Sequence, residues 1–254
     1  MNSFRTQVRQ RDTLIGPLLT LGSPEVAEVF TILGYDWMWI DLEHTPLNLE
    51  RAQILIQAIA GRAGTIVRVP WNDPVHIKRA LDLGCDGVMV PQIRTADEAR
   101  QAVAASKYPP AGIRSVGIAR AQQYGLTLQE YVLGANERVV VVLQIEHIDA
   151  VSNIDEILEV PEIDAIIIGP YDLSASMGMP GQINHPDVVA VMESLAAACN
   201  KHKIAWGAFA PSVATAKAHL SRGATLIALG TDTIHLGNAA RLALAEMKQA
   251  LPRQ

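Results

Sequence analysis

Short apolar runs alternate with helix-like segments along the whole chain. Several runs, such as RVVVVLQIE and IDAIIIG, are continuous and rich in β-branched residues. Continuous apolar strands are typical of parallel sheets, because such sheets are covered on both faces. The pattern predicts eight strands, at Thr13–Leu19, Trp37–Asp41, Thr65–Val69, Gly87–Val90, Val139–Ile145, Ala165–Ile168, Ala205–Phe209 and Thr225–Leu229.

Helical patterns lie between these strands, and their starts are well marked. Segments such as SPEVAEV and DPVHIK combine a capping Ser or Asp with a proline that the first helical turn tolerates. Glycines follow several of the predicted helix ends, as in LGY, LGC and RGA. The predicted helices include Pro24–Leu33, Leu49–Ala60, Pro74–Leu83, Asp97–Ala105, Pro186–His202 and Ser212–Leu220.

Eight strands alternating with helices in 254 residues predict an α/β fold, a (β/α)8 TIM barrel. The alternative, an open doubly wound sheet, is less favoured because no G-x-G-x-x-G motif follows an early strand. No Gly- or Pro-rich linker divides the chain, so a single domain over residues 1–254 is expected. The stretch Tyr108–Ala135 is predicted to be a lid or an elaborated loop after the fourth strand.

Composition narrows the class of protein. The chain is 49% hydrophobic and 19% charged, with a net charge of -5 and a pI near 5.8, which argues against nucleic-acid binding. Its two cysteines, Cys85 and Cys199, support neither a disulfide framework nor a zinc site. The first residues lack the apolar core of a signal peptide, and no apolar run approaches the roughly 18 residues that span a bilayer. A cytoplasmic protein without a membrane partner is expected.

Polar residues stand at the ends of several predicted strands. In a (β/α)8 barrel the active site lies where the strands end, so these residues are expected to converge. Each is unremarkable alone, but together they place carboxylates, an amide, a guanidinium and an imidazole at one end of the barrel. They are Glu43, His44, Arg68, Gln144, Glu146 and Asp172.

Two of the carboxylates suit a divalent metal ion. Glu146 and Asp172 follow neighbouring strands, and two such oxygen donors with water and substrate fit Mg²⁺ or Mn²⁺. Alternatively, Glu146 accepts a bond from a backbone N–H group and Asp172 caps the turn YDLSAS.

Arg68 and His44 each have two interpretations. Arg68, in VRVP, could form a structural ion pair with a carboxylate such as Asp41, or stabilise an anionic oxygen of a reaction intermediate. His44, after DLE, could be a buried structural histidine or could transfer protons. The lysines fall in predicted helices or loops, which disfavours Schiff-base chemistry.

Four segments carry a resemblance to a known family: WIDLEHTPLN, the long segment from VRVPWNDPVHIK to GIRSVG, LQIEHIDAVSNIDEIL, and IDAIIIGPYDLSASMGMPG. They resemble the class II, metal-dependent pyruvate aldolases. More narrowly, the chain is similar to the 4-hydroxy-2-oxoheptane-1,7-dioate aldolase and 2-dehydro-3-deoxyglucarate aldolase family over about residues 15–247. The resemblance implies a barrel of the phosphoenolpyruvate/pyruvate type.

The resemblance also implies an activity. It is the reversible cleavage of a 4-hydroxy-2-oxo acid to pyruvate and an aldehyde, through a metal-bound pyruvate enolate with Mg²⁺, Mn²⁺ or Co²⁺. It implies a homo-oligomer, possibly a hexamer. By the same resemblance, Glu146 and Asp172 are metal ligands, Arg68 stabilises the enolate oxygen, His44 is the acid/base, and Asp82 raises the basicity of that histidine. The implied pyruvate contacts are Gln144, Gly169, Pro170, Tyr171 and Asp172.

The sequence departs from the family near the acceptor pocket. GPLLTLGSP has leucines where close relatives often carry an aromatic residue, and RSVGIARAQQYG also differs. Arg114, Arg120 and Tyr124 could meet the acceptor there, or could serve subunit contacts or face solvent. The alternatives to an aldolase are an acyl-CoA lyase, a citrate-type synthase, or a non-catalytic barrel.

Overall fold

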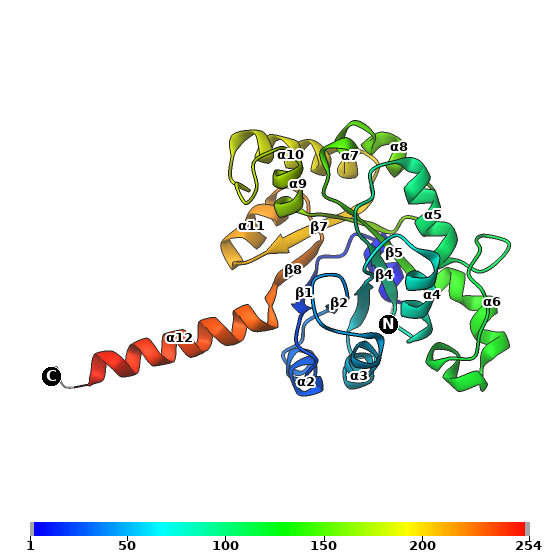
Figure 1. Ribbon diagram of the computed structural model, residues 1–254, viewed down its shortest axis with the longest axis horizontal. Coiled ribbons are helices and arrows are strands. Elements are labelled where there is room, and N and C mark those ends of the chain that lie inside the picture. The colour runs from blue at the N-terminus through cyan, green and yellow to red at the C-terminus, as the bar shows by residue number, and fades with distance from the viewer. Residues whose placement is uncertain (1–2, 252–254) are drawn as a thin grey trace.

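A closed barrel of eight parallel strands forms the centre of the molecule (Figure 1). The computed structural model describes residues 3–251. Each strand pairs with the next, and the eighth closes onto the first. The strands are β1 (Leu14–Leu19), β2 (Trp37–Asp41), β3 (Gly64–Arg68), β4 (Gly87–Val90), β5 (Val140–Ile145), β6 (Ala165–Ile168), β7 (Ala205–Ala210) and β8 (Leu226–Thr231).

Helices connect the strands and cover most of the outer surface of the barrel. They are α1 (Phe4–Arg9), α2 (Pro24–Ile32), α3 (Leu49–Ile59), α4 (Pro74–Asp82), α5 (Ala96–Ser106), the 3-10 helix η1 (Arg120–Gly125), α6 (Leu128–Arg138), α7 (Ile148–Ser152), α8 (Ile154–Leu158), α9 (Pro170–Ser176), α10 (Pro186–Lys201), α11 (Val213–Ser221) and α12 (Asp232–Ala250).

The predicted barrel is confirmed, and each predicted strand lies within two residues of an observed one. The continuous apolar runs are explained by two separate cores. Val141 points outward to the layer of helices, whereas Val140 and Val142 fill the interior of the barrel. Successive residues of one strand are therefore all buried, and the strand does not alternate between apolar and polar residues.

The segment predicted as a lid or loop, Tyr108–Ala135, is more regular than expected. It contains η1 and most of α6, and Gln123 and Tyr124 within η1 have left-handed backbone angles. Arg114 binds this segment to the layer of helices by an ion pair of 2.8 Å with Asp82 at the end of α4.

A buried ion cluster attaches α1 to the amino-terminal end of the barrel. Arg5 is almost fully buried; its Nε lies 2.9 Å from Asp164 and its Nη2 lies 2.5 Å from Glu162. The fully buried Lys107 lies 3.5 Å from the same Glu162 carboxylate. Burial alone would raise the pKa of Glu162, but the hydrogen bond and charge of Arg5, with Lys107 and Arg9, lower it to about 2.

The Glu162 cluster predicts a specific dependence of stability on pH. A carboxyl whose pKa falls from 4.5 to about 2 on folding stabilises the protein fully above pH 4.5 and loses that contribution between those values. We expect Glu162→Gln to reduce the free energy of unfolding by about 1 kcal/mol near pH 6, since the carboxylate is 42% exposed and screened. Urea titrations at pH 6 and pH 3 should show the difference from wild type shrinking at the lower pH. A difference that is the same at both values would contradict this account.

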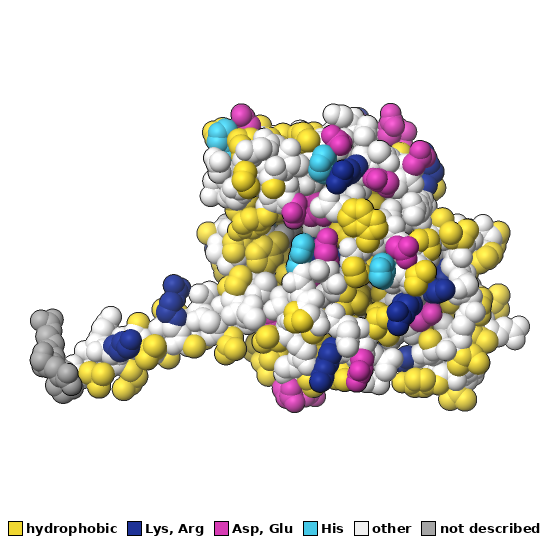
Figure 2. Space-filling model, in the orientation of Figure 1, with side chains coloured by type: hydrophobic (Ala, Val, Ile, Leu, Met, Phe, Trp, Pro, Cys, Tyr) yellow, Lys and Arg dark blue, Asp and Glu magenta, His cyan; other side chains and the backbone are white. Residues whose placement is uncertain are grey.

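The last helix, α12, projects away from the barrel instead of packing on it (Figure 1). Of its side chains only Asp232, its first residue, is buried. Large apolar side chains along it are exposed: Leu236, Leu242, Leu244 and Met247, with Leu251 directly after the helix. Figure 2 shows hydrophobic side chains along the lower edge of the projecting arm. Among the described helices, none is both long and apolar enough to cross a membrane.

Candidate active site

The carboxyl ends of the strands bring most of the predicted site residues together. A cleft of about 370 Å³ opens there. Its lining comes from β1, β2, β3, β5, β6, β7 and β8 and from the loops that follow them. The predicted residues in that lining are His44, Arg68, Gln144, Gly169, Pro170, Tyr171 and Asp172.

Arg68, the last residue of β3, is held by a bidentate ion pair. Its Nε and Nη2 donate to the two oxygens of Asp41 at 2.8 and 2.7 Å. Arg68 therefore forms the structural ion pair and can also stabilise an anionic oxygen. The ion pair with Asp41 uses Nε and Nη2, so Nη1 remains available to the cleft. Nη1 lies 3.4 Å from Oε1 of Gln144 and 3.0 Å from Oε2 of Glu43. The guanidinium also lies 4.8 Å from the centroid of the Trp39 ring.

Glu146 directly follows β5 and is bound to Gln144, which lines the cleft, although Glu146 itself does not. It is 2% exposed, and its Oε1 accepts a hydrogen bond of 3.0 Å from the backbone N–H of Gln92. The backbone alternative for Glu146 is thus observed. Oε2 accepts a bond from Nε2 of Gln144, which leaves lone pairs on both oxygens. Burial, with the nearby charges of Glu43 and Asp172, raises the pKa of Glu146 to about 7.

Asp172 enters the site from the first turn of α9. Gly169 precedes that helix, and a Cβ there would lie only 2.6 Å from Oε2 of Glu146, so the two segments meet at a distance that glycine alone permits. Within the part of the chain that is described, no capping bond to the side chain of Asp172 is found. The carboxylate is exposed to the cleft, and its charge raises the pKa values of Glu43 and Glu146.

His44 stands at the rim, and the structure does not pair it with Asp82. The His44 side chain is 65% exposed, with Nε2 3.7 Å from Oε2 of Glu43. Asp82 ends α4, beside the amino-terminal ends of the strands, where it binds Arg114. The two residues lie at opposite ends of the barrel. Within one chain, Asp82 therefore cannot raise the basicity of His44 as the resemblance implies. The interpretation of His44 as a buried structural histidine was wrong.

Within one chain the structure does not show the alternative in which Arg114, Arg120 and Tyr124 meet the acceptor, because none of the three lines the cleft. Tyr124 is exposed. Arg114 is buried, lies 4.6 Å from the Tyr108 ring centroid and is bound to Asp82. Arg120 donates to the carbonyl oxygen of Leu83. Both arginines are committed to the layer of helices, and neither lines the cleft at the strand ends.

Four site residues were not assigned from the sequence. Glu43 was noticed at a strand end but received no role; burial raises its pKa to about 7 although Arg68 opposes this. Gln92 has a left-handed φ of 58° that turns its N–H group toward Glu146. Phe209 lines the cleft from β7. Asp232 accepts bonds from the backbone N–H groups of Thr20 and Leu21 and so fixes the loop after β1.

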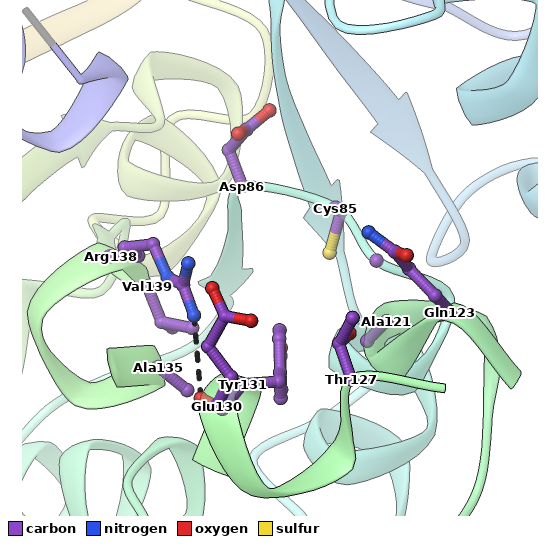
Figure 3. Close-up of a pocket in the computed structure, with 11 residues that line it drawn as sticks. Cys85, Asp86, Ala121, Gln123, Thr127, Glu130, Tyr131, Ala135, Arg138 and Val139 are labelled. Carbon is purple, nitrogen blue, oxygen red and sulfur yellow. Dashed lines mark hydrogen bonds between the residues drawn. The ribbon is translucent and has the colours of Figure 1, made fainter. Parts of the chain in front are cut away.

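A second cleft, of about 290 Å³, lies at the other end of the barrel (Figure 3). The side chain of Cys85, just before β4, points toward η1 and α6 across it. The carboxylate of the next residue, Asp86, points away and accepts hydrogen bonds from Thr65. Burial raises the pKa of the Cys85 thiol to about 12, so a nucleophilic thiolate is not formed near neutrality. None of the predicted site residues lines this cleft.

The donor set at the strand ends suits a divalent cation that prefers oxygen ligands. Within residues 3–251 no group of three or more His, Cys, Asp or Glu side chains is arranged to hold a metal ion. Two carboxylates, Glu146 and Asp172, remain, and Mg²⁺ is commonly held by one or two carboxylates with the rest of its ligands from water and substrate. The open lone pairs of buried Glu146 and the free carboxylate of Asp172 fit that arrangement.

The protein is a parallel eight-stranded barrel with acidic, amide and guanidinium groups at the carboxyl ends of its strands. Enzymes with this fold have their active sites at that end of the barrel. The family model described as HpcH/HpaI aldolase/citrate lyase matches residues 16–239, and the chain belongs to this family. This result confirms the family and the carbon–carbon lyase class that the sequence motifs predicted.

Relatives cover almost the whole chain. It is 41% identical to the 4-hydroxy-2-oxo-heptane-1,7-dioate aldolase of Shigella sonnei over 242 residues, which are 94% of this chain and 92% of the relative. An HpcH/HpaI aldolase/citrate lyase family protein from Burkholderia cenocepacia has a solved structure with a TM-score of 0.94 and 36% identity, covering 98% and 100% of the two chains. The citrate synthase SbnG is similar at a TM-score of 0.87 and 28% identity, covering 98% of each chain.

Proposed function

We propose that this protein is a divalent-metal-dependent aldolase that reversibly cleaves a 4-hydroxy-2-oxo acid to pyruvate and an aldehyde. The observation that carries the proposal is that Asp172 and Arg68 line one cleft at the strand ends, with the buried carboxylate of Glu146 bound to Gln144, which lines the same cleft. The aldolase names of relatives at 41% identity support it. The cytoplasmic location and the single-domain organisation stay predictions.

The reaction develops negative charge on an oxygen of the substrate, and Arg68 is the positive side chain that lines the cleft. In the cleavage direction the C4 hydroxyl loses its proton, the C3–C4 bond breaks, and its electron pair moves into an enolate of pyruvate. A divalent cation held by Glu146 and Asp172 would supply Lewis acidity for the developing enolate oxygen. Arg68 supplies a second, fixed positive group, because Asp41 holds its other two nitrogens.

The other residues bind and orient the substrate. Gln144 keeps its amide between Arg68 and Glu146, in reach of the keto acid. The first N–H groups of α9, at Tyr171 and Asp172, have no partner inside their helix and can receive the pyruvate carboxylate. His44, exposed at the rim, is the group that can accept the C4 hydroxyl proton. Leu18 and Phe209 give the acceptor end of the cleft apolar walls.

A product assay tests this function. Purified protein with pyruvate, Mg²⁺ or Mn²⁺ and a panel of aldehydes should form 4-hydroxy-2-oxo acids detectable by NMR. The chain is also similar to the citrate synthase SbnG, so the competing reaction to test is citrate formation. The substrates for that test are oxaloacetate and acetyl-CoA. Citrate formation without aldol products would overturn the proposal in favour of a citrate-type synthase, and the absence of both would favour a non-catalytic barrel.

We propose further that the protein is a homo-oligomer, with a hexamer as the state expected from the family resemblance. Leu236, Leu244, Met247 and Leu251 follow one side of α12 at helical spacing, exposed in the single chain. No helix after β8 returns to cover the barrel in the described chain, and the neighbouring α2 exposes Val29 and Ile32. A second copy could cover both apolar surfaces by burying α12.

Two variants test whether the apolar side of α12, formed by Leu236, Leu244, Met247 and Leu251, is covered by a second copy. Leu244→Glu should shift the protein to a smaller species, because burying a carboxylate where leucine packed costs several kcal/mol per contact. Leu242→Glu is the control, since Leu242 is similarly exposed but points to the opposite side of the helix. Light scattering after size-exclusion chromatography measures both masses. Equal masses for Leu244→Glu and wild type would contradict the role of this stripe.

A further inference from the structure

The turn after β4 has a backbone conformation that its sequence does not favour. Gln92 has a φ of 58°, in the left-handed region, which is uncommon for a residue that carries a Cβ. Within residues 3–251, the other non-glycine residues with positive φ lie within η1 or in connections that follow helices. Gln92 instead lies two residues beyond a strand, at the carboxyl end of the barrel. Backbone strain of this kind clusters at active sites and persists only where the surrounding structure holds it.

Two hydrogen bonds hold the turn against the end of β5. The backbone N–H of Gln92 donates to Oε1 of Glu146 at 3.0 Å. The next N–H, that of Ile93, donates to the carbonyl oxygen of Gln144 at 3.2 Å, and the fully buried Ile93 side chain anchors the turn. In an extended strand successive N–H groups point to opposite sides, so the left-handed φ of Gln92 is what lets both face β5.

The bond from Gln92 reaches a carboxylate that is proposed as a metal ligand. Glu146 is 2% exposed, and its other oxygen, Oε2, accepts from Nε2 of Gln144. One donor on each oxygen fixes the orientation of the carboxylate, while each oxygen keeps a further lone pair. Gly169 approaches so closely that an added Cβ would lie 2.8 Å from the Cβ of Glu146. The position of this carboxylate therefore depends on the turn at Gln92 as well as on β5.

The side chain of Gln92 points to another partner. Its Oε1 accepts a hydrogen bond of 3.2 Å from Nη2 of Arg94, and Gln92 does not line the cleft at the strand ends. The bond to Glu146 comes from the backbone N–H. We infer that Gln92 is a positioning residue, whose left-handed backbone orients the carboxylate of Glu146 to hold a divalent cation. The inference rests on the proposed function, because it takes Glu146 as a ligand of that cation.

Two substitutions that remove the same side chain are expected to differ. Valine is β-branched and strongly disfavours a left-handed φ, so Gln92→Val should turn the N–H away from Glu146. Glycine adopts such a φ readily, so Gln92→Gly should keep the N–H in place. Loss of a group that orients a metal ligand typically weakens metal binding roughly 10–100-fold. We expect the Kd for Mn²⁺ to rise by about that factor in Gln92→Val and by less than about threefold in Gln92→Gly.

Electron paramagnetic resonance of added Mn²⁺, without substrate, measures this Kd, because the signal of the free ion is lost on binding. The full chain is first treated with a chelator, and binding that disappears in Asp172→Ala is assigned to the site. Arg94→Ala removes the partner of the Gln92 side chain and is the control, which should bind Mn²⁺ as wild type does. Circular dichroism identifies a variant that fails to fold.

A measurement on the wild type does not depend on the folding of any variant for its result. Incorporation of ¹⁵N-glutamine makes the Gln92 N–H visible by NMR, and its signal is the one lost in Gln92→Gly or Gln92→Val. Titration with Mg²⁺ should shift this signal saturably, because the N–H donates to the carboxylate that binds the ion.

Three results would overturn the role of Gln92. They are a Gln92 signal that does not move as Mg²⁺ binds, a folded Gln92→Val protein that binds Mn²⁺ as tightly as wild type, and an equal loss of affinity in Gln92→Gly and Gln92→Val. Wild-type protein that binds no Mn²⁺ would instead overturn the proposed metal-dependent function, and this inference with it.

Discussion

Replacing Glu146 by glutamine is expected to lower kcat/KM for aldol cleavage by about 10³-fold, which corresponds to about 4 kcal/mol of lost transition-state stabilisation. The substitution keeps the size of the side chain but removes the charge of a proposed metal ligand. Glu146 is buried, and the amide oxygen of a glutamine can still accept the N–H of Gln92, although its NH2 group cannot accept from Nε2 of Gln144. Steady-state rates at saturating Mn²⁺ measure the loss.

The control for this loss is Glu156→Gln, which removes an exposed carboxylate on α8 far from the strand ends and should leave the rate unchanged. Circular dichroism of both variants separates a folding defect from a chemical one. A Glu146→Gln enzyme that is folded and within threefold of the wild-type rate would contradict the role of this carboxylate.

Arg68→Lys should lower kcat by on the order of 10²–10³-fold with a smaller change in KM, as expected for the loss of one donor to a developing oxyanion. Lysine keeps the positive charge, but it cannot bind both oxygens of Asp41 and also present a nitrogen to the cleft. The measurement is the separate determination of kcat and KM for the cleavage reaction.

Two further variants sharpen the interpretation of Arg68. Asp41→Asn should reproduce part of the loss through misplacement of the guanidinium, although Asp41 itself does not line the cleft. Arg79→Lys, at an exposed position of α4, should behave as wild type. A purely structural Arg68 would give a loss of stability in urea titrations with kcat unchanged in the folded fraction.

The strands could be predicted from the sequence because burial on both faces leaves an unbroken apolar run. Other elements lacked such a signal. Helix α1 is short, and its anchoring residue Arg5 is charged, so only its partners Asp164 and Glu162, far away in the chain, explain its burial. Helix α12 begins directly after β8 with Thr231 as its cap. Its direction away from the barrel depends on contacts outside the single chain, which no local pattern encodes.

The positions of residues at the ends of strands could be predicted from the sequence. The positions of residues in the loops could not. Arg68 and Glu146 were found because parallel strands end together. Gln92 was missed because its contribution is a backbone N–H group turned by a left-handed φ, which its side chain does not signal. Asp82 was placed in the site by resemblance alone, and within one chain its helix ends at the opposite end of the barrel.

In the proposed function, Glu146 and Asp172 hold one divalent cation that makes the methyl protons of pyruvate acidic. Exchange of pyruvate methyl protons in D₂O, followed by NMR with chelator-treated protein, tests it without any assumption about the aldehyde. We expect exchange only after Mg²⁺, Mn²⁺ or Co²⁺ is added, saturating with the cation and absent in Asp172→Ala. Equal exchange with and without the cation, or unimpaired exchange in Asp172→Ala, would contradict the account.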